Sequence, residues 1–245
     1  MMKLIMTMAG KYQRFKLFGN KVPKYLMPLG KNSVLWHVIE EFINIQSKVE
    51  IFLIANNKDR DFEPVLLSIM DHFSIPFNNL AYIEDTDSQL ATAITIEKLF
   101  NNIFENNNEP LAFTNIDTVL KNRSNFFDKL LKIDPESGLV DAFLGNSHEY
   151  SYVMESEDDL LAKDIVDKNR ISSFACSGLY GFGSASFFLN ESKNMLASES
   201  GNFTSLYKSL LLNKKNVFIN KNNDPRDTIV LGTPEEYITN LHKFN

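Results

Sequence analysis

Residues 3–10 of the chain are KLIMTMAG, an apolar run that ends at a glycine. A short apolar run bounded in this way is typical of a strand buried inside a sheet, so we predict the first strand at residues 3–8. A polar loop from Ala9 to Lys31 follows. Because open α/β sheets bind ligands at the carboxyl ends of their strands, this loop is the first candidate for a binding site.

The same alternation continues through the first half of the chain. Helix-spaced apolar residues between 35 and 43, with Asn32 or Ser33 as the N-cap, predict the first helix. Further strands are predicted at residues 50–55, 80–84 and 111–115, and further helices at 61–73 and 89–104. Strands that alternate with helices predict an α/β fold with a doubly wound, mostly parallel central sheet of the Rossmann-like type.

The second half of the chain is more mixed. Strand patterns occupy residues 150–155, 161–166 and 178–182, and a helical pattern occupies 202–212. Thr233, Pro234 and Glu236 form a capping box that predicts a terminal helix. We therefore expect a single domain over 1–245, with a small antiparallel lobe around residues 140–180.

Composition narrows the class of protein. The formal net charge of −6 argues against the extended basic face that nucleic acid or an acidic membrane surface requires. The single cysteine, Cys176, excludes an internal disulfide and a cysteine-cluster zinc site. The apolar start is too short for a signal peptide or a membrane span, so we expect a cytoplasmic protein that binds neither nucleic acid nor membrane. The sequence makes no prediction of the oligomeric state.

Three residues of the first loop suit a phosphate ligand. Gly10 allows backbone amides to approach an anion closely, and Arg14 and Lys24 can neutralise a triphosphate. Taken alone, one glycine and two cations are more typical of a solvated turn.

Acidic residues follow two of the predicted strands. Asp117 ends the stretch FTNID, where Mg²⁺ could bridge its carboxylate and phosphate oxygens, or where it could simply begin a turn. Asp85 and Asp87 form an Asp-x-Asp that suggests a metal-dependent glycosyltransferase. Such an enzyme would have little use for Arg14 and Lys24, so we interpret these two aspartates as turn residues and a helix cap.

Taken in order, these stretches resemble the signature of the nucleotidyltransferase family that makes sugar nucleotides and related CDP or UDP conjugates. The family pattern is a strand, then A-G-x-G-x-R, P-K-x-L and G-K, and later N-G-D, E-K, G-x-Y-x-F and G-T-P-E-D-Y. The matching stretches here are AG at 9–10, R at 14, PKYL at 23–26, GK at 30–31, SQLAT at 88–92, NID at 115–117, DK at 167–168, SGLYGF at 177–182 and GTPEEY at 232–237. The resemblance covers residues 3 to 237, and it depends on the order of the motifs more than on any one of them.

The resemblance implies transfer of a nucleoside monophosphate from an NTP to a small phosphorylated acceptor, with Mg²⁺ as cofactor and release of pyrophosphate. It implies a nucleotide-binding part at 1–138 and an acceptor-side part with the C-terminal helix at 139–245. The roles that it implies are the α-phosphate and acceptor for Lys24, the β- and γ-phosphates for Arg14, Mg²⁺ for Asp117, the nucleotide for Ala9, Gly10, Lys11, Gln89 and Asn115, and the acceptor for Lys168 and Gly178.

The chain departs from the family pattern at three positions. Tyr12 stands where the second glycine of the phosphate loop usually lies, and Ile116 replaces the glycine of N-G-D. Val230 stands where many relatives place a second metal carboxylate. Two interpretations stay open: Asp224 or Asp227 supplies the second carboxylate, or a single carboxylate holds the ion together with waters.

Within the family, the compact chain and its Met-Ala-Gly start most resemble nucleotidyltransferases encoded with bacterial capsule genes. This implies CMP transfer from CTP to L-glutamine phosphate in capsular polysaccharide modification. One alternative is a hexose-1-phosphate nucleotidyltransferase that makes a UDP-, CDP- or dTDP-sugar. Because of Tyr12 and Val230, a second alternative is a degenerate nucleotide-binding module with a regulatory role.

Overall fold

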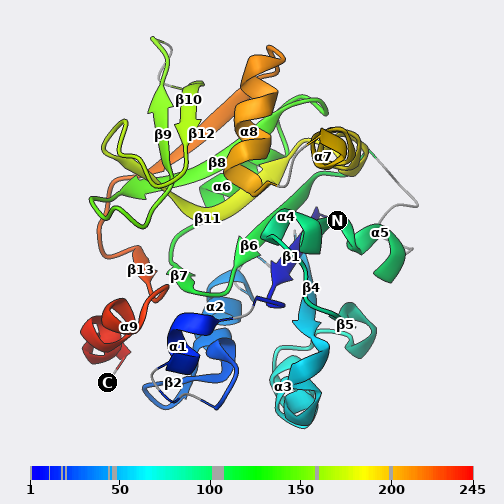
Figure 1. Ribbon diagram of the computed structural model, residues 1–245, viewed down its shortest axis with the longest axis vertical. Coiled ribbons are helices and arrows are strands. Elements are labelled where there is room, and N and C mark those ends of the chain that lie inside the picture. The colour runs from blue at the N-terminus through cyan, green and yellow to red at the C-terminus, as the bar shows by residue number, and fades with distance from the viewer. Residues whose placement is uncertain are drawn as a thin grey trace.

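The centre of the molecule is a nine-stranded sheet that branches at β11 (Phe174–Phe182). The computed structural model describes residues 2–10, 12–17, 19, 21–43, 45, 49–100, 108–157, 160–198 and 201–244. Four parallel strands form one half of the sheet, in the order β5 (Leu80–Ile83), β4 (Val49–Asn56), β1 (Met2–Thr7) and β6 (Leu111–Asn115). β11 runs antiparallel to β6 and continues the sheet (Figure 1).

Two arms leave β11. One is β8 (Gly138–Leu144), which pairs antiparallel with β11 and parallel with β12 (Val217–Asn222). The other is a hairpin of β9 (Tyr152–Glu155) and β10 (Ala162–Val166), which meets the start of β11. The expected doubly wound, mostly parallel sheet is confirmed. Its antiparallel lobe is smaller than the predicted 140–180, because β8 and β11 belong to the central sheet and the hairpin alone projects from it (Figure 1).

Alternating residues of the parallel strands supply two hydrophobic cores, one on each face of the sheet. On β1, Leu4 and Met6 belong to one core and Ile5 to the other, as the period of two in a strand requires. The first face is covered by α2 (Val34–Ile43), α3 (Glu63–His72) and α6 (Ser124–Leu130). The second face is covered by α4 (Gln89–Ile94), α5 (Ile96–Leu99), α7 (Ala185–Ser198) and α8 (Phe203–Leu212).

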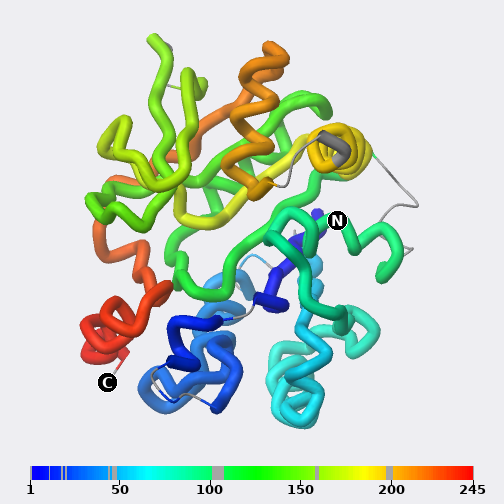
Figure 2. Tube along the Cα trace, in the orientation of Figure 1, coloured from blue at the N-terminus to red at the C-terminus, as the bar shows by residue number. Residues whose placement is uncertain are grey.

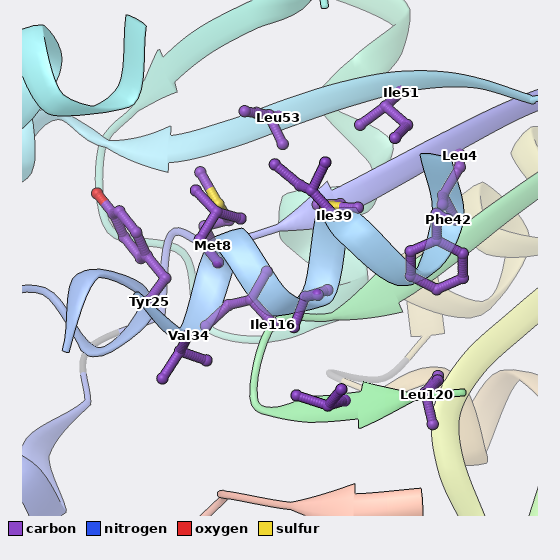
Figure 3. Packing of buried hydrophobic residues seen from close by; sticks show 14 of the residues in the cluster. Leu4, Met8, Tyr25, Val34, Ile39, Phe42, Ile51, Leu53, Ile116 and Leu120 are labelled. Atoms are coloured by element: carbon purple, nitrogen blue, oxygen red, sulfur yellow. The ribbon is translucent and has the colours of Figure 1, made fainter. Parts of the chain in front are cut away.

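Helix α2 shows how the sequence pattern becomes packing. The hydroxyl of Ser33 accepts a hydrogen bond from the backbone N–H of Trp36 at 3.2 Å, which confirms Ser33 as the N-cap. One turn further, Ile39 lies beside Ile51 and Leu53 of β4 (Figure 3). Full burial of one such side chain contributes about 1.5–3 kcal/mol to folding. The row of buried apolar residues on one side of α2 therefore fixes this helix on the sheet.

The helix predicted at 89–104 is shorter and broken. Its cap is the Ser88 hydroxyl, which accepts from the Ala91 N–H at 3.1 Å, so the cap expected at Asp85 or Asp87 is corrected by one residue. Thr95 separates α4 from α5, and its hydroxyl donates to the Thr92 carbonyl at 2.6 Å. Such bonding between a side chain and its own helix competes with regular helix geometry. Residues 101–104 lie outside the described residues.

Short elements form the loop between β1 and α2 and the other connections. These are α1 (Gln13–Leu17), the 3₁₀ helices η1 (Lys24–Leu26), η2 (Asn57–Phe62) and η3 (Phe77–Asn79), and the hairpin of β2 (Pro28–Leu29) and β3 (Asn32–Ser33). Because η2 occupies residues 57–62, α3 begins two residues later than predicted, with Pro64 in its first turn as expected. No helix among the described residues is both long and apolar enough to cross a membrane.

The C-terminal segment folds back onto the N-terminal loop. β13 (Thr228–Val230) pairs with β7 (Thr118–Leu120), and α9 (Pro234–Asn240) follows with the predicted capping box. The chain ends in η5 (Leu241–Phe244). The Tyr237 hydroxyl donates to the Pro28 carbonyl, and Gly30 packs against the backbone of Phe244. Figure 2 shows the red C-terminal segment next to the blue segment that follows β1.

Candidate active site

Two cavities adjoin beyond the carboxyl ends of β1 and β6. The large cavity, of about 560 Å³, is lined by the end of β1 and its loop, the start of α4 and the end of β6. The small cavity, of about 230 Å³, lies between the β6–β7 turn, the loop before β9, the start of β11 and the segment after β13. Four residues line both cavities, namely Arg14, Asn115, Asp117 and Gly232. The two spaces therefore share one wall.

The structure gathers most of the sequence-predicted residues around these cavities. The large cavity is lined by Ala9, Gly10, Arg14, Lys24, Gln89, Asn115 and Asp117. Lys168 and Gly178 line the small cavity. Lys11 lies outside the described residues. Arg14, Lys24 and Asp117 thus face one shared space although Asp117 lies about a hundred residues further along the chain.

Lys24 is held at the shared wall by three contacts. Its Nζ atom lies 3.0 Å from Oδ2 of Asp117 and donates to the Gly232 carbonyl at 2.9 Å. The ammonium also lies 4.8 Å from the centre of the Phe15 ring. The side chain is only 9% exposed. A buried ammonium requires such partners, and these fix its position at the junction of the cavities.

Asp117 and Gly232 are brought together by the β7–β13 pair. Val230 pairs with Thr118, and the Leu231 N–H donates to the Asp117 carbonyl at 2.7 Å. A two-strand ladder thus places the backbone after β13 beside the carboxylate at the end of β6. The sequence motifs indicated Asp117, but the carbonyl of Gly232 was missed because a backbone acceptor has no side-chain signature.

Asn115 lines both cavities, and its side chain is held by Gln89. The Gln89 side-chain amide donates to the Thr7 hydroxyl at 2.9 Å and to Oδ1 of Asn115. Gly178 lies opposite with φ of +90°, and a Cβ there would lie 2.5 Å from Nδ2 of Asn115. Glycine at 178 is therefore required by both backbone conformation and space.

Tyr12 has a backbone conformation that favours glycine. Its φ is +32°, in the left-handed region that favours glycine. The Tyr12 hydroxyl donates to Asp59, and the Tyr25 hydroxyl donates to the same carboxylate oxygen at 3.1 Å. Burial, followed by the hydrogen bond to Asp59, raises the pKa of Tyr12 well above its usual range, so the hydroxyl stays a donor. The strained backbone at Tyr12 is thus anchored by its own side chain.

Arg14 is paired across the small cavity. Its guanidinium lies 2.7 Å from Oε2 of Glu149, a residue in the loop before β9. The hydrogen bond from Arg14 lowers the pKa of Glu149. Next to it, the Tyr150 hydroxyl donates to Oε1 of Glu236 at 2.7 Å. Sequence analysis missed Glu149 as a cavity residue, because nothing in its local sequence marks a site. Glu236 belongs to the GTPEEY stretch, but only its capping role was predicted.

At the shared wall, Asp117 could hold Mg²⁺ only if phosphate oxygens of a bound substrate also coordinated the ion. Among the described residues, no three His, Cys, Asp or Glu side chains gather as a metal site. Asp224 pairs with Arg226 and Asp227 accepts from Asn122, and neither lines the cavities, so they do not supply a second carboxylate there. Mg²⁺ is commonly held by one or two carboxylates plus phosphate oxygens and waters. Asp117 fits that arrangement.

No protein-family model matches the sequence, and no curated protein is significantly similar in sequence. Solved structures are similar to the chain over its whole length. A nucleoside-diphosphate-sugar pyrophosphorylase from Vibrio cholerae RC9 has a TM-score of 0.84 at 20% identity, with 99% of this chain and 100% of that chain covered. A UDP-glucose pyrophosphorylase complexed with UDP-glucose has a TM-score of 0.77 at 16% identity, with 100% and 98% covered. An inositol-1-phosphate CTP transferase from T. maritima has a TM-score of 0.71 at 10% identity, with 98% and 94% covered. These similarities show that the chain shares the fold of these structures.

Proposed function

We propose that the protein is a Mg²⁺-dependent nucleotidyltransferase that transfers a nucleoside monophosphate to a small phosphorylated acceptor. The observation that carries the proposal is that Asp117 lies at the wall shared by two adjoining cavities, with Lys24 of the large cavity 3.0 Å from its carboxylate. A reaction that joins two phosphorylated molecules needs two adjacent spaces and positive charge where they meet. The names of the structures with this fold support the same reaction class.

The proposed reaction is an in-line displacement at the α-phosphorus of the NTP. A phosphate oxygen of the acceptor forms the new O–P bond, the bond between the α-phosphorus and its bridging oxygen breaks, and pyrophosphate leaves with the electron pair. Lys24 stabilises charge on the α-phosphate, and Arg14 binds the β- and γ-phosphates. When bound, Mg²⁺ neutralises phosphate oxygens, with Asp117 as its protein ligand. The rest of the catalysis is positioning and charge stabilisation.

The large cavity is the proposed nucleotide site, and Gln89 favours CTP within it. Both N–H groups of its side-chain amide are used, by Thr7 and Asn115, and Gln89 lines the cavity, so we propose that its amide oxygen is the atom that binds the nucleobase. An acceptor suits the exocyclic amine of cytosine and disfavours the carbonyl that uracil and thymine carry at the same position. This supports CMP transfer over UMP or dTMP transfer.

The small cavity is the proposed acceptor site, with Lys168 on the acceptor phosphate. Our favoured acceptor is L-glutamine phosphate, which would make the protein a CTP:phosphoglutamine cytidylyltransferase of capsular polysaccharide modification. The alternative is a hexose 1-phosphate. It is favoured by the similar fold of a UDP-glucose pyrophosphorylase in complex with UDP-glucose.

Pyrophosphate release tests the proposal. Each of CTP, UTP, dTTP, ATP and GTP is incubated with Mg²⁺ and either L-glutamine phosphate or a hexose 1-phosphate. Turnover with CTP and L-glutamine phosphate supports the favoured reaction, and turnover with a hexose 1-phosphate alone supports the alternative. Tight nucleotide binding without pyrophosphate in any combination would overturn the enzyme in favour of the regulatory module.

A further inference from the structure

The three carboxylates that line the small cavity differ in how firmly hydrogen bonds and ion pairs hold them. Its carboxylates are Asp117, Glu149 and Glu236. Asp117 is paired with the buried Lys24. Glu236 is held at both oxygens, by the Tyr150 hydroxyl at 2.7 Å and by the Thr233 N–H at 2.9 Å. Glu149, by contrast, is a partly exposed carboxylate of the cavity lining, 46% exposed, whose ion-pair partner is Arg14.

The backbone that carries Glu149 is anchored at the cavity. The Glu149 N–H donates to the Ser147 hydroxyl at 3.2 Å, and the Ser147 carbonyl accepts from the Tyr152 hydroxyl at 2.9 Å. The Tyr150 carbonyl accepts from the Lys168 N–H at 3.1 Å. The carboxylate can therefore change its partner while its backbone stays at the rim of the cavity.

Arg14 is the partner for which a bound triphosphate would compete. It lines both cavities, whereas Glu149 lines only the small one. A triphosphate in the large cavity carries more negative charge than one carboxylate and offers Arg14 bidentate oxygens. Lys168, the other cation near Glu149, faces the acceptor phosphate in the proposed reaction. With both cations bound to phosphates, Glu149 is left beside two anions.

We infer that Glu149 selects an acceptor that carries a protonated amine as well as a phosphate. The ammonium of the acceptor takes the place that Arg14 vacates, so in the nucleotide-bound protein the Glu149 carboxylate is neutralised only by an acceptor that carries the amine. This inference rests on the proposed function and deepens it, because it names the chemical class of the acceptor: a phosphorylated molecule that also carries a free, protonated amine. A neutral phosphorylated sugar leaves Glu149 uncompensated.

Binding of two matched probes tests the inference. The protein is saturated with Mg²⁺ and α,β-methylene-CTP, which cannot release pyrophosphate, and is titrated by calorimetry with 2-aminoethyl phosphate or 2-hydroxyethyl phosphate. The two probes differ only in the amine. We expect the amine probe to bind roughly three- to fivefold more tightly, as a partly exposed charge pair allows. In Glu149→Gln that preference falls to about twofold or less.

A matched control removes an equal charge outside the cavities. Glu235 is exposed and lines neither cavity, so Glu235→Gln keeps the preference for the amine probe. Equal binding of both probes by the unaltered protein, or an undiminished preference in Glu149→Gln, overturns the inference. If the inference fails in this way but pyrophosphate is still released with a neutral acceptor, the proposed function stands and only the role of Glu149 is withdrawn. Failure to bind the CTP analogue, together with no pyrophosphate release from any of the five NTPs, overturns the proposed function itself.

Discussion

The ammonium nitrogen of Lys24 lies 3.0 Å from a carboxylate oxygen of Asp117, although the two residues are 93 positions apart in the chain. Both belong to the turn region beyond parallel strands, where a doubly wound sheet concentrates its loops. This pair defines the centre of the candidate site, and most of the tests below act on it or on the residues that place it.

Replacement of Lys24 by methionine removes the charge while it keeps the packing against Phe15. We expect kcat to fall by about 10²–10³, because a charge-assisted contact to the transition state is lost. Steady-state pyrophosphate release measures this, with circular dichroism to show that the variant is folded. Lys132→Met, at an exposed position, serves as the control and keeps full activity. Near-normal turnover in Lys24→Met would remove this residue from the mechanism.

Asp117→Asn tests the metal role separately. The amide can still accept the hydrogen bond from Lys24, but it is a poor ligand for Mg²⁺. We expect a loss of at least about 10² in kcat and a higher Mg²⁺ concentration for half-maximal activity. Asp224→Asn lies outside both cavities and leaves the Mg²⁺ titration unchanged. If Asp224→Asn instead raised the Mg²⁺ concentration needed for half-maximal activity, Asp117 would not be the metal ligand.

Tyr12→Phe removes the hydroxyl that anchors the phosphate loop to Asp59. Asp59 is 6% exposed and keeps only the Tyr25 hydroxyl among these two donors, so we expect a loss of about 1–3 kcal/mol in unfolding free energy. The KM for the nucleotide should rise as the loop loses its anchor. Urea denaturation and kinetics measure the two effects. Tyr12→Gly relieves the positive φ, so it is expected to be less damaging than an alanine at the same position.

A buried ion pair braces the strands beside the site. Arg123 lies 2.8 Å from Asp141 of β8 and donates to the Thr228 hydroxyl of β13 at 2.6 Å, with both charged side chains fully buried. Arg123→Met leaves Asp141 without its cation and is expected to cost about 3–5 kcal/mol. Denaturation in the double variant with Asp141→Leu checks the cause, because removal of both charges restores part of the loss. No recovery would mean that shape and not charge holds these strands.

The thiol of Cys176 is expected to react slowly although it lines the small cavity. Burial raises its pKa well above the usual range, so the thiol is neutral throughout pH 7–9 and becomes a thiolate only at higher pH. Alkylation by iodoacetamide at pH 8, followed by mass spectrometry, should be at least about tenfold slower than that of free cysteine. Rapid labelling would show that water and reagent reach the sulfur as a thiolate.

The parallel half of the fold was predictable because its signal is local. A strand at 3–8 and a helix with Ser33 as cap follow from residues that are close in sequence. The strands β8 and β12 were not predicted: β8 is buried through almost its whole length and so shows no alternation, and β12 pairs with it in parallel from far along the chain. Boundaries inside 89–104 shifted because Thr95 bonds within its own helix.

The order of the motifs was enough to predict that Arg14, Lys24 and Asp117 lie together, and all three line the large cavity. It did not predict the residues with which they pair. Glu149 lies 135 residues from Arg14, and the carbonyl of Gly232 lies 208 residues from Lys24. Such contacts are set by the path of the backbone through the folded sheet. Neither local spacing nor residue type carries that information.

The strap formed by residues 230–244 has a consequence for the order in which the protein matures. Lys24 is translated early, but the carbonyl of Gly232 that holds its ammonium and the Tyr237 ring that packs on Phe15 come from this late segment. A growing polypeptide can therefore form β1, β4 and β6 before the contacts that fix the Lys24 ammonium exist. We expect a chain truncated before residue 230 to keep these parallel strands but to hold the Lys24 side chain less rigidly.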